Sequence, residues 1–239
     1  PAAAQKVAMR RGGELIHAHR TDGLCRDVYG KRRGLGRDRI WTLAKRARVW
    51  SQVALRSPTS LTQLLQEAPS DGGSGDQEGQ PSPQSFFAKC RRMKSAFMQD
   101  LHSGFTDRVL ARRKPTFAAA LHPLLDRFSG LRAIDGSKLD AIAHRLKILW
   151  KNRAVVLPGA VVAHYDLVYG VVRKLGFDPG AAASELKRAI RSLDGVEAGT
   201  LFVADRLYGN AAFFAELASR GLFGVVRYNK TMGLEGVEV

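Results

Sequence analysis

Residues 200–228 read TLFVADRLYGNAAFFAELASRGLFGVVRY, and their pattern decides the fold. Residues 200–205 are nearly all apolar, which is typical of a strand in the middle of a sheet that is covered on both faces. Residues 210–220 have the length of a helix, and Gly221 follows as a natural C-cap. Residues 222–228 are a second apolar run, which predicts another buried strand. A strand, a helix and a strand in this order predict an α/β fold.

Three segments on the N-terminal side continue this pattern. Residues 131–139 (LRAIDGSKL) alternate in a way that predicts a strand, with Asp135 on the same face as its apolar neighbours. Residues 159–167 and 171–177 predict a hairpin, and residues 181–193 predict a helix with a buried stripe. The order β, β, β, α, β, α, β therefore predicts a mixed sheet flanked by helices.

Residues 39–128 have mainly helical periodicity. Apolar residues recur every three or four positions in residues 39–56, which predicts an amphipathic helix with a basic face, and a short helix is expected near residues 61–65. Apolar stripes over residues 86–101 and 117–128 predict two further helices. A helical region of this length could hold a helix-turn-helix, although such stripes more often form a core.

The chain is predicted to have three parts. Residues 1–57 form a basic, partly disordered arm with one helix, because residues 1–38 contain scattered glycines and little periodicity. Residues 58–130 form a helical region with a flexible linker, rich in Gly, Ser and Pro, at residues 69–85. Residues 131–239 form the α/β domain.

The chain of 239 residues has a net charge of +16, and most of the excess lies near its start. Residues 1–57 contain 14 basic and four acidic side chains, a net charge of +10. A basic segment attracts phosphate backbones, because neutralised phosphates release condensed counterions, but a solvated tail has the same composition. No apolar run of about 18 residues predicts a membrane span. Cys25 and Cys90 are far apart in the sequence, and two reduced thiols are expected.

Asp135 and Asp205 stand out among the acidic residues, because each lies in or at the end of an apolar strand. Aspartate forms strands poorly, and its charge is costly to bury without a partner. A divalent cation between two carboxylates would remove that cost, and Mg²⁺ or Mn²⁺ suits oxygen ligands. The alternative is that each aspartate caps the turn that follows its strand.

The residues around both aspartates form two recognisable segments. Asp135 follows small and apolar residues and precedes Gly-Ser, in AIDGSKL. Asp205 ends an apolar strand and is followed by Arg, by a Tyr-Gly pair, by a helix and by a strand that closes in Arg227. Both segments resemble those of DDE transposases of bacterial insertion sequences, in the group named after insertion sequence four. The resemblance covers about residues 130–239 and, more weakly, residues 61–110.

This resemblance implies an RNase H-like catalytic domain in residues 131–239, transposition of DNA by a cut-and-paste reaction, and a cytoplasmic, nucleoid-associated protein of a bacterium. Asp135 and Asp205 would be catalytic residues and ligands of Mg²⁺ or Mn²⁺, which activate water or a DNA 3′-hydroxyl for in-line displacement. The implied partners are double-stranded DNA, as transposon ends and target, and a second copy of the chain in a homodimer, but no membrane. Four cations are predicted to contact DNA: Lys138, Arg206, Arg227 and Lys230.

One part of the family pattern is not found. The third carboxylate is a Glu in a Tyr-Arg-Glu-Lys type signature on a later helix, whereas Glu235 and Glu238 lie in a Gly-rich end without helical period. We therefore expect a catalytic domain that is truncated before the third carboxylate and cleaves DNA poorly by itself. Two alternatives stay open: a catalytically inactive DNA-binding remnant or inhibitor, and another RNase H-like DNA nuclease.

Three further side chains have open roles. His164 and Asp166 lie two residues apart on a predicted strand and share a face, so they form either a metal-binding pair or, more commonly, a structural pair. Tyr208 begins the turn after Asp205, where it either packs in the core or bonds near the site.

Overall fold

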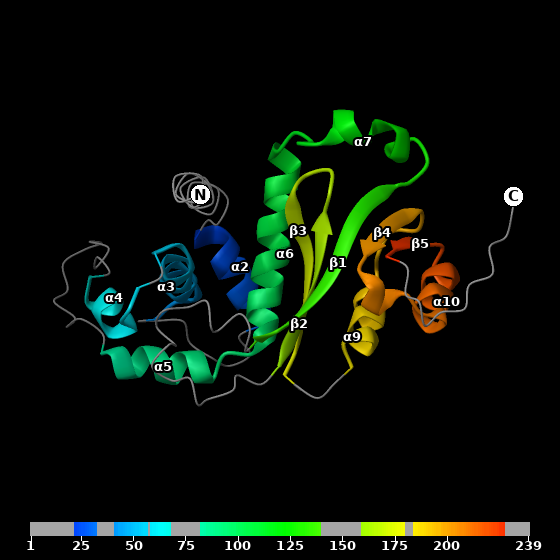
Figure 1. The fold of residues 1–239 in the computed structure, drawn as a ribbon. Helices are drawn as coiled ribbons and strands as arrows, with labels where there is room; N and C mark the ends of the chain where they lie inside the picture. Colours follow the sequence, from blue (N-terminus) through cyan, green and yellow to red (C-terminus); the bar gives the residue numbers. More distant parts are fainter. Residues whose placement is uncertain are drawn as a thin grey trace, which may run out of the picture. The chain divides into compact units, whose positions relative to one another are not determined.

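The computed structural model describes residues 22–32, 41–56, 58–67, 82–139, 159–179 and 184–227. Contacts within the chain divide it into two units. The first unit consists of residues 1–109 and 142–156, and the second consists of residues 110–141 and 157–239. Figure 1 shows helices in the first unit and a sheet with helices in the second.

The described part of the first unit is helical. Its helices are α2 (Asp22–Arg32), α3 (Leu43–Arg56), α4 (Leu61–Glu67), α5 (Pro83–Arg91) and the first part of α6 (Ser95–Arg112). Two apolar clusters hold these helices together. One joins α2, α3 and α6, and the other joins Trp41 with α3, α4 and α5. The predicted helix over residues 39–56 is therefore present from Leu43 onward, with apolar residues in both clusters.

Residues 22–32 correct the prediction that residues 1–38 are irregular and that residues 1–57 contain one helix. They form α2, which buries Leu24, Cys25 and Val28 against residues of α3 and α6. Its four buried residues lie at helical spacing but span only positions 24–29, and their burial depends on helices that are distant in the sequence. Tertiary packing therefore stabilises a helix that local pattern did not predict.

The apolar stripe over residues 86–101 belongs to two helices, not to one. α5 ends at Arg91 and α6 begins at Ser95, because the two halves of the stripe pack into different clusters. α5 also begins inside the predicted linker: Ser82 caps it by accepting the Ser85 N–H at 3.3 Å, and Pro83 starts the helix.

The second unit contains a five-stranded mixed sheet with the order β3-β2-β1-β4-β5. β1 pairs antiparallel with β2 and parallel with β4, β2 and β3 form the predicted antiparallel hairpin, and β4 and β5 are parallel. The element order after α7 is the predicted one. The bounds are α7 (Ala118–Leu125), β1 (Gly130–Lys138), β2 (Ala160–Asp166), β3 (Val171–Asp178), α9 (Glu185–Ser192), β4 (Thr200–Ala204), the 3-10 turn η2 (Arg206–Tyr208), α10 (Ala211–Ser219) and β5 (Phe223–Val226).

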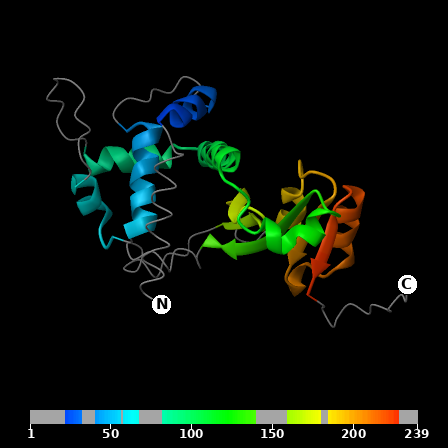
Figure 2. The same cartoon turned by 90° about the horizontal axis from the view of Figure 1, so that it is seen from above.

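Helices pack on both faces of this sheet, but unequally. On the α9/α10 face, Ile134, Val162 and Phe202 form the main core with residues of α9 and α10, which lie together in Figure 1 and in the view from above in Figure 2. On the opposite face, called here the α7 face, Leu131 and Leu201 pack with residues of α7. Neighbouring residues of β4 alternate between the two clusters, as strand geometry requires.

The predicted coverage of β4 and β5 on both faces is wrong. Val203 is 41% exposed and Val225 is 57% exposed, and the register pairs them on the α7 face. β5 is an edge strand of the described sheet, and α7 packs only near the start of β1 and β4. An apolar run predicts burial of a strand, but it does not show how far the covering helix extends.

Cys25 and Cys90 form no disulfide with each other. Among the described helices, none combines the length and the apolar character that crossing a membrane requires.

Candidate functional site

Asp135 and Asp205 are brought side by side by the parallel pairing of β1 and β4. The last pair of this register joins Ile134 to Ala204, so Asp135 within β1 and Asp205 directly after β4 are the next residues along the two chain segments. Neighbouring strands lie about 4.8 Å apart. Together with residues 136–138, the turn after β4 and the end of β5, the aspartates make up one end of the sheet, called here the carboxyl edge. The sequence predicted both residues, and the fold supplies their proximity.

The side chains of both aspartates are exposed, but their local bonds differ. Asp205 accepts the Leu207 N–H at 2.8 Å and is the N-cap of η2. Asp205 therefore does cap the turn after its strand, which is the role that the sequence offered as an alternative to metal binding. The Asp135 carboxylate accepts no hydrogen bond from the described residues. Asp135 alternates with Ile134, which points into the α9/α10 core, so its carboxylate lies on the α7 face.

Tyr208 and Glu185 lie next to this pair on the α9/α10 side. The buried Tyr208 hydroxyl donates to Glu185 Oε1 at 2.9 Å. Burial raises the pKa of this hydroxyl, and the hydrogen bond and charge of Glu185 and the charges of Asp135 and Asp205 raise it further. Tyr208 thus both packs in the core and bonds near the aspartates. Glu185 was missed at the sequence level, because a glutamate in the first turn of a helix is too common to be a signal.

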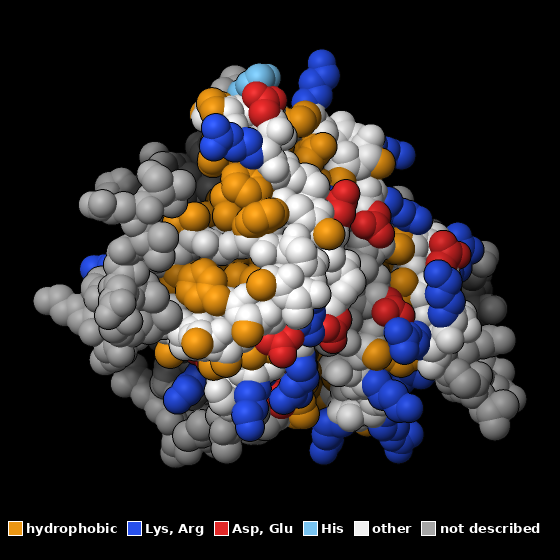
Figure 3. All heavy atoms as spheres, turned by 90° about the vertical axis from the view of Figure 1, so that its right-hand side faces the viewer, with side chains coloured by type: hydrophobic (Ala, Val, Ile, Leu, Met, Phe, Trp, Pro, Cys, Tyr) orange, Lys and Arg blue, Asp and Glu red, His pale blue; other side chains and the backbone are white. Residues whose placement is uncertain are grey.

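Three of the four predicted DNA-contacting cations lie at the carboxyl edge. Lys138 ends β1, Arg206 follows Asp205, and Arg227 follows β5, where its backbone N–H donates to Ala204 O at 3.3 Å. All three side chains are exposed, and no ion pair with another described residue engages them. Lys230 lies outside the described residues. Lysine and arginine side chains are numerous in the lower part of Figure 3, toward which β1 runs in Figure 1.

His164 and Asp166 do not form a metal-binding pair. His164 is fully buried, and its Nε2 lies 2.7 Å from Ser192 Oγ, which itself donates to Ala189 O. Burial, together with the charges of Lys174 and Arg132, lowers the pKa of His164 to about 3.

Asp166 is used in the hairpin turn. Its Oδ1 accepts the N–H groups of Val168 and Tyr169, both at 3.0 Å, and Arg173 lies 3.7 Å from its other oxygen. The pair that the sequence placed on one face is therefore structural.

The two aspartates can supply part of a cation site. Among the described residues, no three His, Cys, Asp or Glu side chains are grouped so as to hold a metal ion. Mg²⁺, however, usually binds one or two carboxylates and completes its shell with water and substrate phosphate. Two exposed, adjacent carboxylates fit that pattern, with oxygen as the only donor type.

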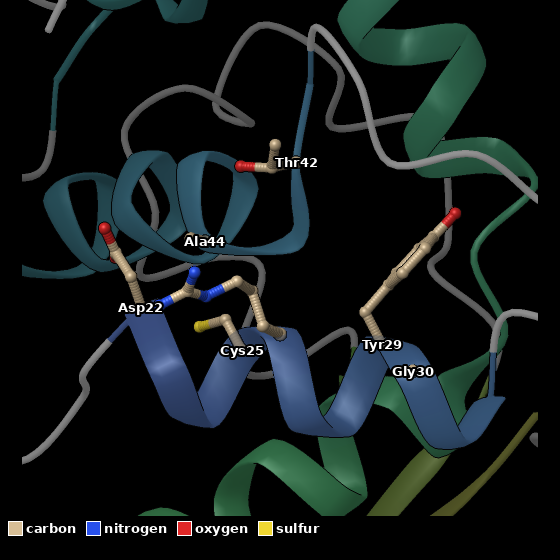
Figure 4. Close-up of a pocket in the computed structure, with 7 residues that line it drawn as sticks. Asp22, Cys25, Tyr29, Gly30, Thr42 and Ala44 are labelled. Atoms are coloured by element: carbon tan, nitrogen blue, oxygen red, sulfur yellow. The ribbon is translucent and has the colours of Figure 1, made fainter. Parts of the chain in front are cut away.

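A cavity of about 480 Å³ lies in the first unit, between α2 and α3. Figure 4 shows its lining. Asp22, Cys25, Arg26, Tyr29 and Gly30 come from α2, Thr42 directly precedes α3, and Ala44 lies in the first turn of α3. No arrangement of a nucleophile with a base, and no group of metal ligands, is found among these lining residues.

Comparison of the chain with protein-family models, with curated proteins and with solved structures finds no match.

Proposed function

We propose that the chain carries part of the active site of a DDE transposase, which cleaves and joins double-stranded DNA by metal-dependent phosphoryl transfer. The observation that carries the proposal is that Asp135 and Asp205 each directly follow the last residue pair of the parallel β1–β4 ladder, which is Ile134 with Ala204. These are the two residues that the resemblance of the sequence to DDE transposases assigns as metal ligands.

The sheet supports the RNase H-like part of this proposal. Three antiparallel strands are followed by two parallel strands that alternate with helices, in the order β3-β2-β1-β4-β5. This order is consistent with the RNase H-like fold that the resemblance implies. Many functions share one fold, so the functional proposal depends on the aspartates and not on the sheet.

Asp135 and Asp205 would hold Mg²⁺ or Mn²⁺ through carboxylate oxygens. The bound cation would lower the pKa of an attacking water or 3′-hydroxyl and stabilise the leaving oxygen. Because both side chains are exposed, a phosphate of the DNA backbone could reach a cation that they hold. Lys138, Arg206 and Arg227 would bind flanking phosphates and orient the scissile strand relative to the aspartates.

A catalytically inactive DNA-binding protein is the second candidate. It is favoured by one observation, that two carboxylates but no third metal ligand gather among the described residues. The cations of the carboxyl edge and the net charge of +16 support DNA binding in both cases.

A DNA-cleavage assay with Asp135→Asn and Asp205→Asn tests the catalytic proposal. With Mg²⁺ and supercoiled DNA, we expect slow nicking by the unaltered chain, because the third carboxylate of the family pattern is not found. Each variant should lose this activity down to the level of DNA without protein, because each substitution removes one charged ligand. Asp126→Asn is the matched control, since Asp126 is exposed after α7 and pairs only with His122 among the described residues.

The remaining outcomes separate the candidates. Nicking that survives both substitutions would contradict the assignment of the aspartates. DNA binding without nicking, unchanged in Asp135→Asn and Asp205→Asn, would identify the inactive DNA-binding protein. Nicking that depends on both aspartates but joins no DNA ends would favour another RNase H-like nuclease.

A further inference from the structure

The hydrogen bond between Tyr208 and Glu185 joins two elements beside the aspartates. Tyr208 is fully buried and closes η2, whereas Glu185 is half-buried in the first turn of α9. The hydroxyl donates to Glu185 Oε1 at 2.9 Å. A buried hydroxyl without an acceptor is destabilising, so this bond ties the turn after β4 to α9.

Glu185 also lies against β1. A Cβ atom added at Gly136 would be 2.5 Å from Glu185 Oε1 and 2.6 Å from its carboxyl carbon. The lack of a side chain at this position thus allows the carboxylate to approach the backbone directly after Asp135. The glutamate therefore contacts β1 on one side and the Tyr208 hydroxyl on the other.

These contacts reach both chain segments that carry the aspartates. Asp205 caps the 3-10 turn that Tyr208 closes, and Asp135 directly precedes Gly136. The charges of both aspartates raise the pKa of the Tyr208 hydroxyl, which places all four groups in one electrostatic neighbourhood. A phenylalanine would fill the same core space beside Phe213, so packing alone does not require the hydroxyl.

We infer that Glu185 and Tyr208 are positioning residues, which hold Asp135 and Asp205 side by side so that both carboxylates bind the same cation. The inference rests on the proposed function. Neither residue is assigned a contact with the cation or with DNA. The Tyr208 hydroxyl holds the turn after β4, and the Glu185 carboxylate links that turn to β1.

Binding of Mn²⁺ to the full chain, followed by electron paramagnetic resonance, tests this inference. We expect Tyr208→Phe and Glu185→Ala to raise the dissociation constant about tenfold, as substitutions next to metal ligands often do. Glu185→Gln should raise it less than about threefold, because the amide oxygen still accepts the hydroxyl. Glu216→Gln on α10 is the matched control and should have no effect, since Glu216 pairs with Arg220.

Two results would overturn the inference. The first is equal Mn²⁺ affinity in Tyr208→Phe, Glu185→Ala and the unaltered chain. The second is an equal loss in Glu185→Gln and Glu185→Ala, because the hydrogen bond would then be irrelevant. The thermal unfolding temperature of each variant identifies any loss that comes from unfolding, and affinities are compared only among folded chains.

A metal-free measurement separates this inference from the proposed function. Carbon NMR at neutral pH gives the carboxyl chemical shifts of Asp135 and Asp205. We expect Tyr208→Phe and Glu185→Ala to change both chemical shifts and to leave that of Asp126 unchanged. Unchanged chemical shifts at both aspartates would overturn the positioning role. If the chemical shifts change but the unaltered chain binds no Mn²⁺, the proposed function fails and the positioning role stands.

Discussion

At the scale of single residues, the second unit uses its polar side chains mainly to hold turns and helix ends. Asp205 caps η2, Asp166 accepts two N–H groups of the hairpin turn, and Lys174 donates to the Asp194 carbonyl, in the turn after α9. His164 has a related role, because its ring bonds Ser192 at the end of α9. The bonds of Asp205 and Asp166 join residues two or three positions apart, whereas those of Lys174 and His164 join residues 20 and 28 positions apart.

His164 should make folding sensitive to acid. Its pKa is lowered to about 3 by burial, followed by the charges of Lys174 and Arg132, whereas the unfolded histidine has a pKa near about 6.5. The unfolded chain therefore binds the proton first as pH falls, and stability decreases between about pH 6.5 and pH 3. The free energy of unfolding, measured with urea, should be lower at pH 5 than at pH 7 by roughly 2 kcal/mol because of this residue.

His164→Gln should remove most of this difference between the two pH values, because glutamine does not titrate. His122→Gln serves as control, since His122 is exposed on α7. An equal pH dependence in the unaltered chain and in His164→Gln would contradict the assignment of the acid sensitivity to His164.

At the scale of elements, β4 combines a buried and an exposed side in five residues. Phe202 is fully buried between the sheet and the helices α9 and α10, and its ring lies 5.1 Å from that of His164, in an edge-on arrangement. Val203, the next residue, is exposed on the α7 face. The same apolar run thus contains one residue of the core and one of the surface.

Substitution within β4 should separate these two sides. Phe202→Ala is expected to lower the free energy of unfolding by about 3–5 kcal/mol, because it leaves a cavity in the main core. Val203→Ala is the matched control, with an expected loss below about 1 kcal/mol. Urea unfolding measures both, and equal losses would show that Val203 is covered in the folded chain.

At the scale of the whole molecule, the excess of positive charge and the cations of the carboxyl edge lead to the same expectation, which is binding to DNA phosphates. Lys138, Arg206 and Arg227 come from three different parts of the chain, and the parallel strands β1, β4 and β5 bring them to one end of the sheet. Their charges lie at the same end of the sheet as the two aspartates and would offset repulsion between these carboxylates and the phosphates.

The salt dependence of DNA binding tests this arrangement. A triple variant with Lys138→Gln, Arg206→Gln and Arg227→Gln should bind any duplex more weakly. The slope of log affinity against log salt should be smaller in magnitude by about 2 to 3. The control is a second triple variant, which also loses three positive charges but at residues that precede β1 in the sequence: Arg112→Gln, Lys114→Gln and Arg127→Gln. Equal changes in both triple variants would place the DNA elsewhere than at the carboxyl edge.

The pattern of apolar residues alone predicted the strands, the hairpin and the helices of the second unit, because each follows from local periodicity. It did not predict α2, the break between α5 and α6, or the exposure of Val203. Each of these depends on partners that are distant in the sequence: α3 and α6 for α2, two separate clusters for the broken stripe, and the short reach of α7 for Val203.

The same division holds for Asp135 and Asp205. The sequence by itself determined their identity, their places near strand ends and the apolar runs that make those strands. Only the tertiary structure decided that β1 and β4 are parallel neighbours. It also decided that the Glu185 carboxylate lies close to the backbone of Gly136 and accepts a hydrogen bond from the Tyr208 hydroxyl. The physical reason is that the strand pairing joins residues 70 positions apart and the Tyr208–Glu185 bond joins residues 23 positions apart, and no local pattern records such contacts.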